Sequence, residues 1–166
     1  MKIYVTLLGR SVWALLNTYY AAADEGCEPD VIHVFAEESY RISSEEVEEG
    51  LKIISEGYGF SPEIKTHVVD DVDFVKAGRK IRKTLRQLME EGNEVSIDIT
   101  PGRKALVTAA LLSAFDLGAE KKLNVDKVLY LAVSETKPEP YYQIPFQIQD
   151  LRNLIEDIQE AKTGGS

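Results

Sequence analysis

Strand-like and helix-like segments alternate along the chain, and this alternation limits the fold more than any other feature of the sequence. Runs rich in β-branched and aromatic residues predict strands over 2–8, 30–37, 62–70, 94–100 and 126–135. Stretches with helical spacing of apolar residues separate them, and the helix after the fourth strand is expected over 102–117. Repeated strand–helix units favour parallel strands joined by right-handed crossovers. The sequence therefore predicts an α/β, doubly wound, Rossmann-like, mostly parallel sheet of order 3-2-1-4-5 with helices on both faces.

The length of 166 residues suits one domain with a substantial core. We expect a single domain over 1–162, with its core in about 1–135 and a C-terminal helix over about 146–162. The last residues, 163–166 (TGGS), are typical of a flexible tail or an engineered scar.

Charge and cysteine content restrict the class of protein. A formal net charge of −9 argues against binding bulk duplex nucleic acid, but it is compatible with a small polyanion in a local basic pocket. The single cysteine, Cys27, cannot form an internal disulfide, which agrees with a reducing compartment. No apolar run approaches the roughly 20 residues that cross a bilayer. The sequence thus predicts a cytoplasmic protein with no membrane segment in this chain.

Two unusual loops follow the first and fourth predicted strands, at residues 9–11 (GRS) and 100–104 (TPGRK). In a sheet of order 3-2-1-4-5 the carboxyl ends of these strands are neighbours at the switch point, where ligands bind. The first loop is no dinucleotide fingerprint, because Gly9 is its only glycine. The second is no nucleotide P-loop, because the earlier glycine and a Ser or Thr after the lysine are missing. We expect Ser11 to be the N-cap of the first helix.

Arg103 and Lys104 stand where a helix begins. Cations there oppose the helix dipole at a cost of a few tenths of a kcal/mol to about 1 kcal/mol, and free N–H groups at a helix start bind anions. Pro101 suits a first helical turn, and Gly102 permits close approach of a ligand to the backbone. On residue chemistry alone, an anion site and two solvated charges explain the pair equally well.

The remaining polar candidates are assigned structural roles. Asp98 lies in a buried strand, where a carboxylate bonded to a neighbouring loop is favoured over a catalytic one. His33 and His67 are read as separate structural histidines. The helix expected over 74–91 carries a basic stripe of Lys76, Arg79, Lys80, Lys83 and Arg86. A solvated helix face is favoured over a nucleic-acid contact for this stripe. A core-facing stripe of Phe74, Ile81, Leu85 and Leu88 lies opposite. No Cys, His or acidic cluster has metal-ligand spacing, so no metal and no cofactor is expected.

The segments DITPGRKALVTAALLSAF (98–115) and VTLLGRSVWALL (5–16) resemble CARF domains, the CRISPR-associated Rossmann-fold family. The family signature is a strand ending in Asp/Asn-x-Thr-Gly-Gly-x-Lys, followed by a helix with small residues. In this chain the signature runs from Asp98 to Lys104 and departs at Pro101, where the family usually has glycine. A Gly/Ser/Thr turn after the first strand, the second signature, is matched by residues 9–11.

The resemblance implies a homodimer whose switch-point loops bind one cyclic oligoadenylate, the second messenger of type III CRISPR complexes, with cyclic tetra-adenylate as the leading ligand. The phosphates are expected on the two loops, with Lys104, Arg103 and Arg10 as counter-charges and with Gly9, Ser11, Thr100, Pro101 and Gly102 lining the site. Adenine pockets are expected beside Trp13, Glu37 or Tyr40, although Trp13 equally fits the core of the first helix.

Some family members cleave the ring without metal, and there the resemblance places Lys104 and Ser11 in the catalytic roles. Others are sensors fused to an effector, so this chain is expected to be a stand-alone member or a separated sensor domain. The alternatives kept open are a dedicated ring nuclease, a DNA-binding regulator that uses the basic stripe, and another nucleotide-binding Rossmann protein.

Overall fold

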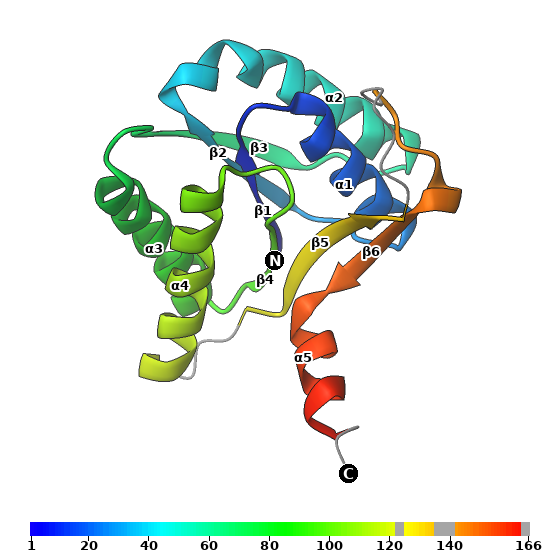
Figure 1. Ribbon diagram of the computed structural model, residues 1–166. Helices are drawn as coiled ribbons and strands as arrows, with labels where there is room; N and C mark the ends of the chain where they lie inside the picture. The colour runs from blue at the N-terminus through cyan, green and yellow to red at the C-terminus, as the bar shows by residue number, and fades with distance from the viewer. Residues whose placement is uncertain (122–124, 135–141, 164–166) are drawn as a thin grey trace.

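A six-stranded sheet of order β3-β2-β1-β4-β5-β6 forms the centre of the molecule in the computed structural model, which describes residues 1–121, 125–134 and 142–163 (Figure 1). The strands are β1 (Lys2–Leu8), β2 (Val31–Glu37), β3 (Glu63–Val69), β4 (Glu94–Asp98), β5 (Lys127–Val133) and β6 (Gln149–Asn153). The first five pair in parallel, and only β6 runs antiparallel, along β5. The predicted class and the predicted order of the first five strands are confirmed.

Helices cover both faces of the sheet, as right-handed crossovers require. They are α1 (Val12–Asp24), α2 (Ser44–Gly57), α3 (Phe74–Glu90), α4 (Lys104–Lys121) and α5 (Leu154–Thr163). α1 and α2 lie on one face and α3 and α4 on the other (Figure 1). Successive side chains of β1 point to opposite faces, so Tyr4 and Leu8 join the α1–α2 core while Val5 and Leu7 join the α3–α4 core. This alternation places the carboxyl end of β1 in the middle of the molecule.

The prediction of one helix over about 146–162 is wrong in its first half. Phe146–Ile148 is a 3₁₀ turn, Gln149–Asn153 is β6, and the helix begins only at Leu154. Half-buried and exposed residues alternate along β6, which pairs with β5 on one side only and therefore carries a polar sequence, QDLRN. Of the predicted tail, residues 164–166 lie outside the described residues.

His33 and His67, read from the sequence as separate histidines, form a stacked pair between β2 and β3. Their ring centroids are 5.0 Å apart, and Nδ1 of His33 lies 2.8 Å from Nε2 of His67. Burial, and next the neighbouring His67, lowers the pKa of His33 to about 4. Burial also lowers the pKa of His67. Neutral imidazoles that hydrogen-bond each other are structural groups, as the sequence predicted for each of them.

Candidate functional site at the carboxyl ends of the strands

The loops after β1 and β4 touch, as their predicted positions at the switch point require. A Cβ atom placed on Gly9 would lie 2.9 Å from the carbonyl oxygen of Pro101 and 3.3 Å from the backbone nitrogen of Arg103. Gly9 is buried, so the lack of a side chain is what permits this approach. The two motifs singled out in the sequence therefore form one surface.

Gly9→Ala is expected to destabilise the protein by about 1–3 kcal/mol, because the new methyl group collides with backbone atoms that have little freedom to move. Gly57→Ala is the matched control, since a Cβ at that exposed position in α2 has no atom within 4 Å. It should be neutral or slightly stabilising. Chemical denaturation of both variants measures the difference. Equal stability of the two variants would show that the loops are further apart than described.

Asp98 lies directly under this surface and is fully buried. Its carboxylate accepts hydrogen bonds from the Thr6 hydroxyl at 3.0 Å and from the Thr100 backbone N–H at 2.9 Å. The Thr100 hydroxyl in turn accepts from the backbone N–H of Leu131 at 2.9 Å. Asp98 is thus bonded to the neighbouring loop, as expected. Burial raises its pKa to about 7, while the hydrogen bonds from Thr100 and Thr6 lower it.

The raised pKa of Asp98 predicts a pH-dependent stability. Between the ordinary pKa near 4 and the folded value of about 7, the folded chain holds a proton that the unfolded chain has lost. The stabilising contribution of Asp98 is therefore complete at low pH and is lost as pH rises through about 7. Asp98→Asn removes this titration and keeps an acceptor oxygen for Thr100. Between about pH 5 and about pH 8, the free energy of unfolding of Asp98→Asn should rise by a few kcal/mol relative to that of the wild type. Denaturant unfolding at each pH measures the difference. A constant difference would mean that the carboxyl keeps its ordinary pKa.

Arg103 and Glu37, both predicted as ligand contacts, are bound to each other. Nε of Arg103 lies 2.5 Å from Oε2 of Glu37, whose side chain is only 1% exposed at the end of β2. The same guanidinium donates to the backbone carbonyl of Asp71 at 2.7 Å, and the Asp71 carboxylate accepts from the Ser39 hydroxyl. The Glu37 carboxylate, and more weakly the Asp71 charge, raise the pKa of Arg103. Arg103 therefore links the loop after β4 to the ends of β2 and β3.

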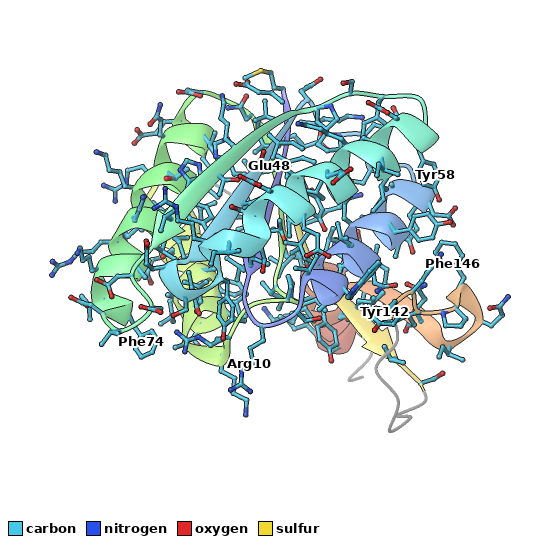
Figure 2. All side chains as sticks on the ribbon, turned by 90° about the horizontal axis from the view of Figure 1, so that it is seen from above. Arg10, Glu48, Tyr58, Phe74, Tyr142 and Phe146 are labelled. Carbon is cyan, nitrogen blue, oxygen red and sulfur yellow. The ribbon has the colours of Figure 1, made fainter. Side chains whose placement is uncertain are left out.

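Arg10 and Lys104 are the cations that this network leaves unpaired. Both side chains are exposed, and neither has a hydrogen-bond or ion-pair partner within 1–121, 125–134 and 142–163. Arg10 extends outward from this edge of the molecule, between Phe74 and Tyr142 (Figure 2). Ser11 is the N-cap of α1, as predicted, and accepts from the Ala14 N–H at 3.1 Å. The edge thus combines two free positive charges with the starts of α1 and α4.

The other predicted contacts are less available to a ligand. A Cβ on Gly102 would meet Leu7 at 2.7 Å and Val107 at 2.8 Å, so this glycine serves packing rather than ligand approach. Pro101 is buried in the loop, and α4 begins at Lys104 rather than at residue 102. Trp13 is 39% exposed and contacts Tyr142 edge-on at 5.4 Å. Tyr40 is half-buried against the α1–α2 core.

Two residues of this network were missed at the level of sequence, and both act through contacts that sequence patterns do not encode. Asp71 contributes a backbone carbonyl, which any residue supplies. Thr6 is an interior strand residue without local signal, and it meets Asp98 because β1 and β4 are paired.

The basic stripe of α3 is partly neutralised within the fold. Lys76 pairs with Asp70 at 3.3 Å, and Lys80 donates to the backbone carbonyl of Val68 at 2.6 Å. Ile81, Leu85 and Leu88 are buried as predicted, whereas Phe74 is 45% exposed at the start of the helix. Asp73 is the N-cap of α3, and its carboxylate accepts from the Lys76 N–H at 3.0 Å.

Two kinds of feature are absent from the part of the chain that the structure describes. No group of three or more His, Cys, Asp or Glu side chains there is arranged to hold a metal ion. Within the same residues, none of the helices combines the length and the hydropathy of a membrane span.

Comparison with known proteins identifies the fold. No family model and no curated protein matches the chain. Can2 from Sulfobacillus thermosulfidooxidans, solved in complex with cyclic tetra-adenylate, superposes with a TM-score of 0.54 at 18% identity, over 78% of this chain and 32% of that chain. Csm6 from Enterococcus italicus, bound to cyclic hexa-2′-fluoro-hexa-dAMP, superposes with a TM-score of 0.57 at 17% identity, over 84% of this chain and 34% of that chain. Protein VC1899 from Vibrio cholerae superposes with a TM-score of 0.60 at 9% identity, over 78% of this chain and 30% of that chain.

The chain therefore spans about a third of the length of each of these structures. The likeness to these structures confirms the Rossmann-like fold expected from the sequence.

Proposed function

We propose that this chain is a sensor domain that binds a cyclic oligoadenylate at the carboxyl ends of β1 and β4, with cyclic tetra-adenylate as the first ligand to test. The observation that carries the proposal is the pair of unpaired cations, Arg10 and Lys104, on adjoining loops of a chain with net charge −9. Free cations beside two helix starts match the phosphates of a small polyanion. Two structural neighbours of this fold were solved with cyclic oligonucleotides, which supports this class of ligand.

The proposed site is completed by a second copy of the chain. Lys104, Thr108, Leu112 and Phe115 follow one another at spacings of three and four residues, so they share one face of α4. All four are exposed, including Leu112 at 60% and Phe115 at 56%. Large apolar side chains exposed in a row are typical of a protein–protein contact. Pairing this face across a two-fold axis brings two Lys104 side chains to one symmetric ring.

Phe115→Asp is expected to convert the proposed dimer to a monomer, because two carboxylates would be buried at the axis. Light scattering measures the mass, and calorimetry should give one ring per two chains for the wild type. Ile42→Asp is the control, since Ile42 is 94% exposed in the 3₁₀ turn Glu38–Ser43 that precedes α2 and is not part of the α4 face. A monomeric wild type, or a dimer that survives Phe115→Asp, would contradict this interface.

Slow cleavage of the ring is compatible with the same site and is kept as a separate question. A ribose 2′-hydroxyl attacks its own phosphorus, the bond to the 5′-oxygen breaks, and the proton of the 2′-hydroxyl passes to the departing 5′-oxygen. The products are a 2′,3′-cyclic phosphate and a 5′-hydroxyl. Lys104 is proposed to stabilise the negative charge and Ser11 to orient the phosphate. Asp98 is fully buried and Glu37 is paired, so neither is positioned as a base, and turnover is expected to be slow.

Titration calorimetry of the purified chain with cyclic tetra- and hexa-adenylate tests the proposal. Heat that saturates with either ring supports it, and absence of heat with both rings contradicts it. Chromatography of the ring after long incubation with a metal chelator separates binding from cleavage. Stabilisation by a dinucleotide or ATP alone would favour another nucleotide-binding Rossmann protein, and salt-sensitive binding to duplex DNA would favour a regulator.

A further inference from the structure

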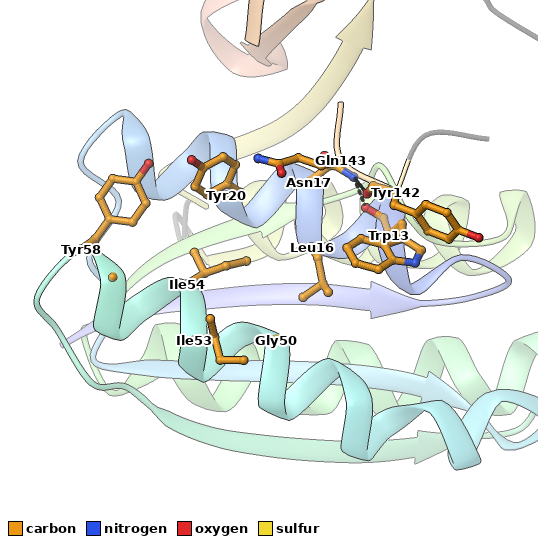
Figure 3. Close-up of a pocket in the computed structure, with 11 residues that line it drawn as sticks. Trp13, Leu16, Asn17, Tyr20, Gly50, Ile53, Ile54, Tyr58, Tyr142 and Gln143 are labelled. Atoms are coloured by element: carbon orange, nitrogen blue, oxygen red, sulfur yellow. Dashed lines mark hydrogen bonds between the residues drawn. The ribbon is translucent and has the colours of Figure 1, made fainter. Parts of the chain in front are cut away.

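An apolar groove runs between α1 and α2, away from the α3–α4 face of the sheet (Figure 3). It has a volume of about 520 Å³. Trp13 and Tyr142 lie at one end of it and Tyr20 and Tyr58 at the other, with Leu16 and Ile53 between them (Figure 3). Among the residues that the structure describes, none that lines the groove is charged, although 28% of the chain is. A large aromatic groove without charge is typical of a recognition surface.

Two polar side chains that line the groove, Asn17 and Tyr58, are hydrogen-bonded within the fold. The Asn17 amide donates to the backbone carbonyls of Trp13 and Tyr142, and its oxygen accepts from the Ile144 N–H at 2.7 Å. The Tyr58 hydroxyl donates to Asp24 at 2.9 Å. These bonds fix the 142–144 segment as one wall of the groove. An occupant therefore meets a wall whose position is fixed by Asn17.

Exposure identifies the groove as a surface that is open to a partner. Ile53 is 62% exposed and Tyr142 is 69% exposed, and both face the groove. On the floor, α1 and α2 approach closely, because a Cβ on Gly50 would lie 2.7 Å from Leu16. The floor is therefore made by two packed helices, whereas the rim carries large apolar side chains in contact with water.

The rim of the groove is acidic. Glu49 and Glu56 lie four residues before and three residues after Ile53, so they flank it on α2. Glu46 precedes Gly50 by one turn at one end, and Asp24 follows Tyr20 by one turn at the other. All four carboxylates are exposed. α1 carries no Lys or Arg, and the single cation of α2, Lys52, lies one turn from both Glu49 and Glu56, so the four carboxylates leave the rim with a net negative charge.

From this combination we infer that the groove is a docking site for a cationic amphipathic helix of a partner protein. The apolar stripe of such a helix fills the space between Trp13, Leu16 and Ile53, and its Lys or Arg residues meet the carboxylates on the rim. This is the recognition mode of a helix laid into a hydrophobic groove, with complementary charge fixing its placement. The inference does not depend on the ring ligand, which is assigned to the ends of β1 and β4.

Trp13 is the only tryptophan of the chain, so its fluorescence reports directly on the groove. The probe is a synthetic, tryptophan-free helix of about 14 residues built from Leu and Lys. A matched helix with Glu in place of Lys has the same apolar stripe. The Leu–Lys helix should bind with a blue shift of the Trp13 emission, at least about tenfold tighter than the Leu–Glu helix, and more weakly as salt is added.

Substitutions locate the probe. Ile53→Asp should weaken the Leu–Lys helix at least about tenfold, whereas Val75→Asp should not, since Val75 is similarly exposed at 64% but lies on α3. Glu49→Lys with Glu56→Lys should reverse the preference between the two helices. Equal binding of both helices, no binding, or undiminished binding by Ile53→Asp would overturn the inference. It would also be overturned if the chain dimerised through Ile53, because the groove would then be a contact between copies.

Discussion

Charge reversal at Lys104 is expected to weaken binding of cyclic tetra-adenylate by at least about a hundredfold. Lys104 is exposed at the start of α4 and has no partner among the residues that the structure describes. In the proposed dimer each ring meets two copies of it, and losing about 1.4 kcal/mol at each copy multiplies two tenfold effects. Titration calorimetry of Lys104→Glu against the wild type measures the change.

Lys83→Glu is the control for this experiment. It makes the same change of charge on an exposed helix position of α3, and it alters the overall field of the protein equally. Affinity should stay within about threefold of the wild type. If both variants lose the same affinity, the ring responds to net charge and not to a site at Lys104. Thermal unfolding of the two variants should match, because neither lysine supports the fold.

The chain topology was predictable because it depends on patterns that repeat along the sequence. The nearly continuous apolar run in 30–37 is typical of a strand buried on both faces, and right-handed crossovers favour one strand order. That order predicts that the loops of Gly9 and Pro101 are neighbours, and the structure shows the contact. The cap at Ser11 was also predictable, because it depends on local chemistry.

Contacts between distant residues were not predictable in the same way. β6 carries polar residues at an edge, so its sequence resembles an amphipathic helix as much as a strand. Glu37 and Arg103 were each identified as site residues, but nothing in either segment indicates that they bind one another across the ends of β2 and β4. The His33–His67 contact likewise depends on the register of β2 against β3. In that register Phe35 lies opposite His67, so His33, two residues before Phe35, is the diagonal neighbour of His67.

Arg103→Met is expected to lower the stability of the protein by about 3 kcal/mol, at the low end of the range for losing one partner of a buried pair. The Glu37 carboxylate is 1% exposed and would be left buried without its counter-charge. The Arg103 side chain is 37% exposed, so water already screens part of the interaction, which is why the lower value applies. For a domain of this size the midpoint of thermal unfolding should fall by about 10 °C.

The double variant Glu37→Gln with Arg103→Met separates a pair from two independent effects. Glutamine removes the buried charge, so the second change should recover at least about half of the lost stability. Arg41→Met is the control for an exposed ion pair. The Arg41 and Glu38 side chains are 68% and 59% exposed, and their charged groups are 3.8 Å apart. The free energy of unfolding of this variant should stay within about 0.5 kcal/mol of the wild-type value. If the double variant is less stable than Arg103→Met, Glu37 is stabilised by water or by another group, and Arg103 is free to contact phosphate. If stability recovers, the ion pair fixes the loop that presents Lys104, and Arg103 acts on the ligand only through that loop.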